Sequence, residues 1–201
     1  MNQKNSLGLD ICFKDEDNPF KLFEEWFDLA KEKEPNDPNA LALATSDKEG
    51  NPNVRMVLLK GFSEKGFVFY TNLNSPKSKA LIVNPKASMC FHWKSLLRQI
   101  RIVGSIENVS DKEADDYYNS RPYKNKIGAW ASSQSEILDK RDDFIEKIKT
   151  YEKKYPSNNV PRPPHWSGWR LMPSQIEFWL DGEGRILSLI HISEPTRLSW
   201  I

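Results

Sequence analysis

Short strand-like segments joined by connections of a few residues fill the middle of the chain. Alternating apolar side chains and β-branched or aromatic content predict strands over residues 40–45, 53–60, 67–72, 86–93 and 98–109. Turn-forming sequences at 47–52 and 61–66 separate the first three, and a helix over 75–83 interrupts the series. Hairpin-length loops join antiparallel strands, whereas parallel crossovers need about a dozen residues or more. The pattern therefore predicts an antiparallel sheet curled into a small closed barrel.

Helical periodicity surrounds this strand-rich region. Asn18-Pro19 combines a cap residue with proline at the first helical position, and it predicts a helix that ends before Pro35. A capping box at 110–113 opens a second helix, and a longer amphipathic helix follows over 137–155. After a proline-rich link, a late strand is expected over 175–180. The fold class is therefore mainly β with helices (α+β).

Composition excludes several classes of protein. With 38% hydrophobic and 28% charged residues in 201, the chain is too apolar for disorder and long enough to bury a core. No run approaches the roughly 20 apolar residues of a membrane span, and the first residues do not resemble a secretory signal. Cys12 and Cys90 form no CxxC motif. We therefore expect a cytoplasmic protein without a membrane partner.

Charge is distributed unevenly along the chain. Residues 1–50 carry 6 Lys/Arg against 12 Asp/Glu, whereas residues 51–105 carry 9 against the single acid Glu64. The positive block lies in the strand-rich region, so it favours an anionic ligand held by the fold. A solvated basic edge that discourages strand aggregation explains the same block equally well.

The common signatures of hydrolases, nucleotide-binding loops and metal sites are absent. The sequence holds no GxGxxG, Walker loop, GxSxG or HExxH. The three histidines, His92, His165 and His191, have no metal-ligand spacing and are more simply polar groups of strands or loops. No metal site is therefore expected.

Two groups of residues in the positive block are candidates for binding anions. Ser75-Pro76-Lys77 places a capping hydroxyl, a first-turn proline and a cation at a helix N-terminus, which attracts phosphate. Arg55 and Lys60 bracket a strand, and they can act together only if a bulge or a strand end turns one of them. Surface solvation is the simpler explanation for each group taken alone.

Two further pairs suit a flat polar ring and a second phosphate. Gln99 and Arg101 share one face of a strand and offer an amide and a cation. Tyr117 and Arg121 are four residues apart on one helical face, which suits a phosphate. Solvation again explains either pair by itself.

Taken together, these segments resemble the pyridoxine/pyridoxamine 5′-phosphate oxidase family. The resemblance runs from about residue 18 to 185, with the motifs in the family's order and spacing. The motifs are NPFKLFEEW (18–26), RMVLLK (55–60), FYTN (69–72), RQIRIVG (98–104), YYNSRP (117–122), IGAWASSQS (127–135) and IEFW (176–179).

The resemblance implies an FMN-binding split antiparallel β-barrel that works as a homodimer, with two FMN molecules at the subunit interface. The implied FMN-binding residues are Arg55, Met56, Val57, Leu58, Leu59, Lys60, Tyr70, Thr71, Lys77, Gln99, Gln134, Ser135 and Trp179. The implied substrate-binding residues are Lys60, Tyr117, Arg121, Asn125 and Arg185. Arg185 is also the implied catalytic residue, lying over the substrate ring beside the flavin.

The resemblance also implies the reaction. Pyridoxamine or pyridoxine 5′-phosphate would lose a hydride from its exocyclic carbon to FMN and become pyridoxal 5′-phosphate. O2 would then accept the electrons and give H2O2. Because a flavin supplies the reactivity, the protein contributes orientation and electrostatics, which agrees with the missing triad and metal motifs.

The sequence departs from the family pattern at several positions. Pro76 stands where the family usually has arginine, and Asn125 replaces a serine of the substrate phosphate site. Leu187 replaces a histidine, and residues 188–201 match no family motif. We therefore expect a mobile arm over 1–17, the oxidase domain over 18–187 and an atypical, non-native tail over 188–201, with a divergent natural terminus as the alternative.

Two other functions remain open at this point. Without the family's histidine and a late arginine, the protein could bind a flavin or a vitamin B6 phosphate without turnover. A barrel with basic and aromatic faces could instead bind single-stranded nucleic acid. The combined motifs favour the oxidase, with a small-molecule substrate and no nucleic-acid partner.

Overall fold

The computed structural model describes residues 18–132, 134–135 and 140–180, and the backbone of 188–193. None of the described helices combines the length and apolar composition needed to cross a bilayer. The core is one eight-stranded sheet in which all the paired strands run antiparallel. Its strands are β1 (Ala40–Ser46), β2 (Pro52–Leu58), β3 (Gly61–Ser63), β4 (Gly66–Asn72), β5 (Lys86–Trp93), β6 (Arg98–Asn108), β7 (Trp166–Leu180) and β8 (Ser188–Ser193).

The sheet is a split barrel, as the family resemblance implied. Its strand order is β2-β1-β5-β6-β7-β4-β3, with β8 paired to β7. In the described part of the chain, β2 and β3 stand at opposite ends of this order, so the closed barrel expected from the hairpin pattern is wrong. The mainly β class with helices is confirmed.

Two strand boundaries differ from the prediction. Residues 61–66 were expected to form only a turn, but Gly61–Ser63 is a short strand that pairs with β4. β7 begins at Trp166 and not at residue 175, because its first half pairs with β4 while its second half pairs with β8. A long strand that changes partners in this way has no single alternation pattern in its sequence.

Gly104 allows β6 and β7 to pack closely where their pairing register shifts. A Cβ atom at this position would lie 1.9 Å from Met172 O and 2.9 Å from Pro173 Cα. Only glycine fits this approach, which marks a bulge in the sheet.

Helix α1 (Pro19–Lys33) follows the prediction and packs against the sheet. Asn18 caps it by accepting a hydrogen bond from Phe20 N at 2.9 Å. The Phe23 ring meets Phe67 and Phe91 edge-on at centroid distances of 4.9 and 5.4 Å. Full burial of one such ring contributes roughly 1.5–3 kcal/mol, so this aromatic contact fixes α1 on the core.

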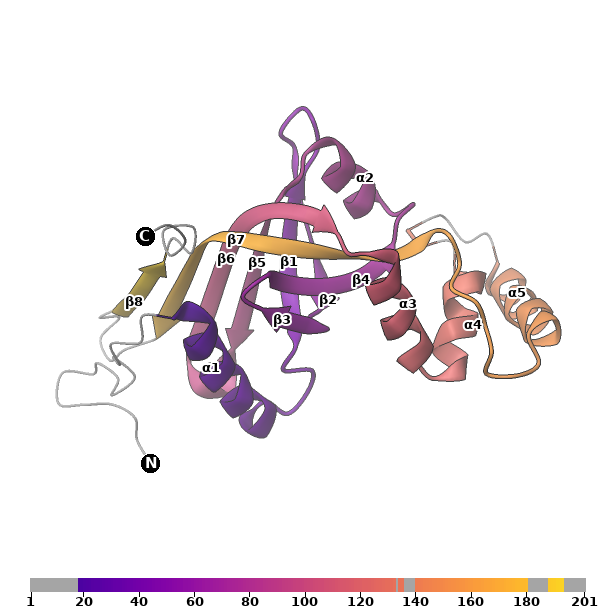
Figure 1. Cartoon of the computed structure of the whole chain (residues 1–201), viewed down its shortest axis with the longest axis horizontal. Helices are drawn as coiled ribbons and strands as arrows, with labels where there is room; N and C mark the ends of the chain where they lie inside the picture. Colours follow the sequence, from indigo (N-terminus) through magenta and orange to yellow (C-terminus); the bar gives the residue numbers. More distant parts are fainter. Residues whose placement is uncertain (1–17, 133, 136–139, 181–187, 194–201) are drawn as a thin grey trace.

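The remaining helices are α2 (Pro76–Val83), α3 (Asp111–Ser120), α4 (Tyr123–Ala131) and α5 (Arg141–Lys154), with a short 3₁₀ turn at Lys94–Leu96. Helix α4 was not predicted, because it starts directly after Pro122 without a side-chain cap. The long helix predicted over 137–155 corresponds to α5, and none of its residues is buried. Helices α3, α4 and α5 gather at one end of the molecule, away from α1 (Figure 1).

Two arginines tether α3 to the sheet region. Arg170 on β7 forms ion pairs with Glu113 at 2.7 Å and Glu107 at 3.2 Å. Arg162 binds Asp111 at 2.8 Å and Asp115 at 2.5 Å. These pairs hold the first turns of α3, so the C-terminal half of that helix has a fixed position beside β4.

Candidate functional site

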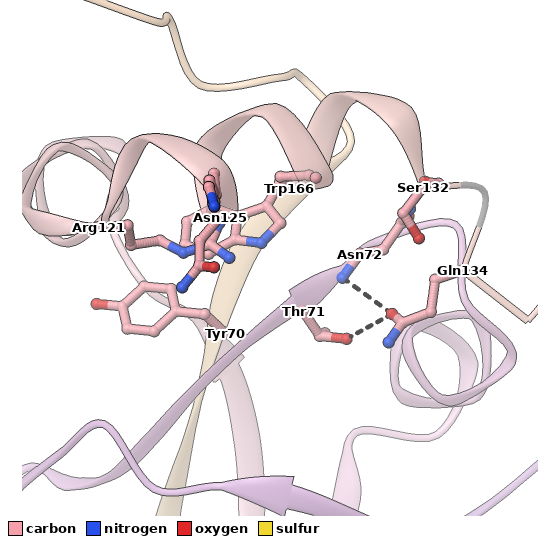
Figure 2. A pocket seen from close by; sticks show the side chains of 11 residues that line it. Tyr70, Thr71, Asn72, Arg121, Asn125, Ser132, Gln134 and Trp166 are labelled. Atoms are coloured by element: carbon pink, nitrogen blue, oxygen red, sulfur yellow. Dashed lines mark hydrogen bonds between the residues drawn. The ribbon is translucent and has the colours of Figure 1, made fainter. Parts of the chain in front are cut away.

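A cleft opens between β4, the start of β7 and helices α3 and α4. It consists of two adjoining cavities of about 360 and 300 Å³. Both cavities are lined by Tyr70, Thr71, Arg121, Asn125, Gln134 and Trp166. Figure 2 shows Tyr70, Arg121, Asn125 and Trp166 on one side of the first cavity, and Thr71, Asn72 and Gln134 on the other.

The cleft brings together most of the residues singled out in the sequence. Its second cavity is lined by Met56, Val57, Leu58, Lys60, Tyr70, Thr71, Lys77, Tyr117, Arg121, Asn125 and Gln134, all predicted site residues, and by Trp166. These residues come from β2 and the residues just after it, β4, α2, α3 and its C-terminal end, α4, the segment after α4, and the start of β7. Segments far apart in sequence therefore meet at one place.

Lys60 can face the cleft because it lies beyond the end of β2 at Leu58. Its backbone N donates to Val68 O at 2.8 Å. Arg55, inside β2, turns away and donates to Thr45 Oγ1 at 2.8 Å and to Leu43 O at 3.0 Å. The strand end expected between the two cations is thus present, although Arg55 itself does not line the cavities.

Lys77 points inward from the first turn of α2 and forms what we call the Lys77 corner, consisting of Thr71, Ser75, Lys77 and Gln134. Its Nζ donates to Thr71 Oγ1 at 3.0 Å, Ser75 Oγ at 3.1 Å and Gln134 Oε1 at 3.2 Å. Ser75 does not cap α2 with its side chain, contrary to the prediction, because its hydroxyl donates to Asn72 O at 2.7 Å.

Lys77 is 7% exposed, and among the described residues its ammonium group has only neutral hydrogen-bond partners. Burial, together with the nearby charge of Arg55, lowers the pKa of Lys77 from 10.5 to about 8. Burial also lowers the pKa of Arg55. A buried cation without a counter-ion is stabilised by any anion that enters, so this corner is suited to a phosphate or carboxylate.

Three nearly parallel aromatic rings stand beside the cleft, and we call them the ring stack. The Tyr70 ring lies 4.1 Å from Tyr117 at an interplanar angle of 12° and 5.2 Å from Trp166 at 6°. Burial, followed by the charge of Glu113, raises the pKa of Tyr70 to about 12, so its hydroxyl stays protonated at neutral pH. The Tyr70 hydroxyl donates to Glu113 O at 3.4 Å, and the stack offers flat aromatic surfaces.

Arg121 is a second partly buried cation of the cleft. Its guanidinium carbon lies 4.8 Å from the Trp166 ring centroid, and its Nη1 is buried without a hydrogen-bond partner among the described residues. Burial lowers the pKa of Arg121. Lys124 and Asn125 stand nearby on α4 and line the first cavity.

The described lining of the two cavities is cationic. It includes Lys60, Lys77, Arg121 and Lys124 but no aspartate or glutamate. Lys77 and Arg121 lie partly out of water, where electrostatic attraction is stronger. The cleft can therefore hold anions at two places, with the ring stack beside them.

Some predicted site residues lie elsewhere. Gln99 and Trp179 face each other as register partners on β6 and β7, outside the described cavity linings. The Leu59 side chain belongs to the core. Ser135 has a left-handed φ of 67° and does not line either cavity. Arg185 and Leu187 lie outside the described residues.

The proposed pairing of Gln99 with Arg101 does not reach the cleft. Arg101 donates from Nε to Glu177 Oε1 at 2.7 Å, and the two side chains form an ion pair between β6 and β7. His165 Nε2 lies 3.0 Å from Ala129 O, a backbone contact. In the described part of the chain, no group of His, Cys, Asp or Glu could hold a metal ion.

Trp166 is the residue of the second cavity that the sequence reading missed. It follows a proline-rich link, where no strand was expected. Asn72 and Lys124, which line the first cavity, were also missed. The signal available was the run His165–Trp169, which holds two tryptophans directly after the proline-rich link.

Part of the atypical tail joins the sheet. Ser188–Ser193 forms β8, which pairs with β7 from Ile176 to Leu180. The expectation that residues 188–201 are non-native stays a prediction.

Family and sequence comparisons agree with one another. Residues 29–179 match the family model described as pyridoxamine 5′-phosphate oxidase. A protein of Pelagibacter ubique named pyridoxine/pyridoxamine 5′-phosphate oxidase is 59% identical, over 100% of this chain and 97% of its own length. A Rhizobium etli protein of the same name is 52% identical, over 92% of this chain and 89% of its own.

Solved structures show the same fold. PhzG from Burkholderia lata, crystallised with tetrahydrophenazine-1-carboxylic acid, superposes with a TM-score of 0.83 at 27% identity, covering 89% of this chain and 88% of that one. A pyridoxamine 5′-phosphate oxidase-related, FMN binding protein from Nostoc punctiforme reaches a TM-score of 0.65 at 16% identity, over 85% of this chain and 95% of that one. The latter likeness concerns the fold alone.

Proposed function

This chain belongs to the pyridoxamine 5′-phosphate oxidase family, and we propose that it oxidises pyridoxamine and pyridoxine 5′-phosphate to pyridoxal 5′-phosphate with FMN as cofactor. The observation that carries the proposal is the lining of the cleft. Lys77 and Arg121, two partly buried cations without carboxylate partners in the described part of the chain, line one cavity beside a stack of aromatic rings. This arrangement suits two phosphorylated ring compounds held side by side.

The Lys77 corner fits the phosphate of FMN. Lys77 and Thr71 direct donors to one point, where Gln134 Oε1 now accepts from both. Arg55 lies near enough for its charge to act on Lys77. It would therefore supply the second positive charge that the family usually has at the position of Pro76. The segment Met56–Leu58 would border the flavin ring along the second cavity.

Bound FMN would accept the hydride that leaves the exocyclic carbon of the substrate, and O2 would take up the electrons and yield H2O2. The protein's own residues orient the substrate. Arg121 and Asn125 would hold the substrate phosphate with Tyr117, and Lys60 would reach the same molecule from the end of β2. Arg185 is proposed to lie over the substrate ring.

We also propose that two copies of the chain form the complete site. Val54, Met56 and Leu58 are 65%, 65% and 39% exposed on one face of the edge strand β2, and the last two line the cleft. An exposed apolar stripe of this kind favours association. A partner copy is the simplest way to bring Gln99 and Trp179 to a flavin, since neither lines the cleft of its own chain.

We further propose that the protein works in the cytoplasm, because its two cysteines form no CxxC motif or zinc spacing and the sequence reads most simply as that of a protein in a reducing compartment.

Purified protein incubated with FMN, pyridoxamine 5′-phosphate and O2 tests the activity. We expect a flavin absorption spectrum, formation of pyridoxal 5′-phosphate and an equal amount of H2O2. Arg121→Gln should raise the KM for the substrate, whereas Arg101→Gln, which removes an exposed cation outside the cleft, should leave it unchanged.

The alternative functions give different results in the same experiment. A yellow protein that forms no pyridoxal 5′-phosphate would be a binding protein without turnover, as the substitution at Leu187 suggested. A protein that takes up no FMN but binds oligonucleotides in a salt-dependent manner would contradict the proposal entirely.

A further inference from the structure

Three arginines near α3 are held in two different ways. Arg162 and Arg170 each bind two carboxylates, so their charges are neutralised within the fold. Arg121 has no such partner among the described residues. Its guanidinium carbon instead lies over aromatic rings, 4.8 Å from the centroid of Trp166 and 5.7 Å from that of Tyr118.

This difference matters for ligand binding. A carboxylate that positions an arginine also competes with any anion for its N–H groups. An aromatic face attracts the guanidinium without accepting its in-plane hydrogen bonds. Arg121 therefore keeps its charge on the wall of the cleft, and its buried Nη1 has no hydrogen-bond partner among the described residues.

Trp166 is itself a rigid support. Its backbone N donates to Pro163 O at 3.0 Å, and its carbonyl oxygen accepts from Arg162 Nη1 at 2.9 Å. It pairs with Asn72 in the sheet, and the residue is 7% exposed. The Tyr70 ring stacks on it at 5.2 Å. The indole therefore has one position, fixed from several sides.

We propose that Trp166 is a positioning residue that determines specificity for the phosphate group of the substrate. It holds the Arg121 guanidinium in the cleft in place of a carboxylate, so that the cation stays free to bind a phosphate. The inference rests on the proposed function, in which Arg121 binds the phosphate of the substrate. It adds Trp166 as the residue that orients this cation.

Kinetics of the FMN-loaded Trp166→Leu variant test the inference. Loss of the cation–π contact should raise the KM for pyridoxamine 5′-phosphate about tenfold, with kcat changed less than about twofold. FMN retention should not change. The matched control is Trp130→Leu, which removes an indole that contacts Lys154 at 5.7 Å outside the cavity linings. The control should leave KM unchanged.

A double-mutant cycle separates positioning from general packing. Arg121→Lys keeps the charge but cannot stack a guanidinium on the indole. If Trp166 acts through Arg121, Trp166→Leu should add little to the effect of Arg121→Lys on KM. Additive effects would overturn the inference. Should Trp166→Leu fail to fold, Trp166→Phe replaces it as the test, because its smaller ring keeps part of the cation–π contact. Its KM should lie between those of the wild type and Arg121→Lys. If Trp166→Phe and Arg121→Lys both had the wild-type KM, the inference would also be overturned.

Binding of inorganic phosphate distinguishes failure of this inference from failure of the proposed function. Phosphate binding is measured by calorimetric titration in variants that also carry Lys77→Met. This substitution removes the other anion site, the Lys77 corner. Weaker phosphate binding in Trp166→Leu than in Trp130→Leu would support the role of Trp166 even in a protein that forms no pyridoxal 5′-phosphate. Equal binding in the two variants would contradict it whether or not the protein is active.

Discussion

The ammonium group of Lys77 donates a hydrogen bond to Gln134 Oε1 at 3.2 Å, and this single amide oxygen is shared with other donors. Thr71 Oγ1 donates to it at 3.0 Å and Asn72 N at 3.4 Å. Three donors thus converge on one neutral oxygen. A phosphate oxygen carries more charge than an amide oxygen, so it would be the stronger acceptor at this point.

FMN retention should fall as pH rises through the pKa of Lys77. That pKa is about 8 without a bound anion, so the ammonium loses its charge between about pH 7 and 9. Lys77→Met should weaken FMN binding about tenfold at pH 7 and remove most of this pH dependence. Equilibrium dialysis of FMN across this pH range measures both effects.

Lys79→Met is the matched control, because Lys79 is exposed on the same helix. It should bind FMN with the affinity and pH profile of the wild type. Identical profiles for the Lys77 and Lys79 variants would remove Lys77 from the cofactor site.

The stability of the protein without FMN should change with pH in the opposite direction. The pKa of Lys77 is near 10.5 in the unfolded chain and about 8 in the folded one. Between these values the unfolded state binds more protons, so the free energy of unfolding rises with pH, by ~1–3 kcal/mol. Urea denaturation at pH 7, 8, 9 and 10 should show this rise in the wild type and not in Lys77→Met. Above pH 10 the raised pKa values of Tyr70 and Tyr118 begin to oppose it.

Local sequence signals predicted the elements that depend on local chemistry. The Asn18 cap, the turn at 47–52 between the paired strands β1 and β2, and the Ser110 cap of α3 are all present, with Ser110 Oγ accepting from Glu113 N at 3.2 Å. In each case the deciding interaction joins residues a few positions apart. The sequence therefore contained the information without knowledge of the fold.

Features that depend on distant segments were not predictable in this way. β7 begins at Trp166 because β4 pairs there, and the barrel is split because β2 and β3 end the strand order. Trp166 enters the cleft only through that pairing. Motif order identified most residues of the cleft, but it could not indicate that Arg121 rests on an indole.

Removing the Arg170 side chain should loosen α3. The Arg170 side chain is 16% exposed and binds Glu113 and Glu107, so Arg170→Gln leaves two carboxylates without their cation. We expect a loss of ~2–4 kcal/mol in the free energy of unfolding. The exposed pair between Lys112 and Asp116 on α3 offers the control, since Lys112→Gln should cost at most ~1 kcal/mol. Equal losses by urea denaturation would contradict a special role for the Arg170 cluster.

A charge on the exposed face of β2 should prevent dimer formation. Val54 is 65% exposed and does not line the cleft, so Val54→Asp changes the apolar stripe without altering the cavity walls. Light scattering after gel filtration should show the wild type as a dimer and Val54→Asp as a monomer with reduced FMN binding. Ile145→Asp, an exposed position on α5, should remain dimeric. A wild-type monomer that binds FMN fully would refute the proposed two-copy site.

Gly168 controls the position of the ring stack, and Gly168→Ala should reduce activity more than stability. Gly168 is the register partner of Tyr70, and a Cβ atom there would lie 2.7 Å from Tyr70 Cε1 and 2.9 Å from Val109 Cγ2. The Tyr70 ring must shift, but it is packed against Tyr117 at 4.1 Å, so the shift disturbs the wall of the cleft. We expect kcat/KM to fall about tenfold, a typical effect of displacing a side chain that orients the substrate.

The control for this substitution is Gly61→Ala, because a Cβ atom at Gly61 meets nothing within 4 Å. Its kcat/KM and its thermal midpoint should both equal those of the wild type. In Gly168→Ala, the free energy of unfolding should fall by only ~1–2 kcal/mol. The added Cβ atom meets side-chain atoms, and these can move aside more easily than backbone atoms. If kcat/KM were unchanged in Gly168→Ala while the protein remained folded, Tyr70 would have no part in orienting the substrate, and the ring stack would serve packing alone.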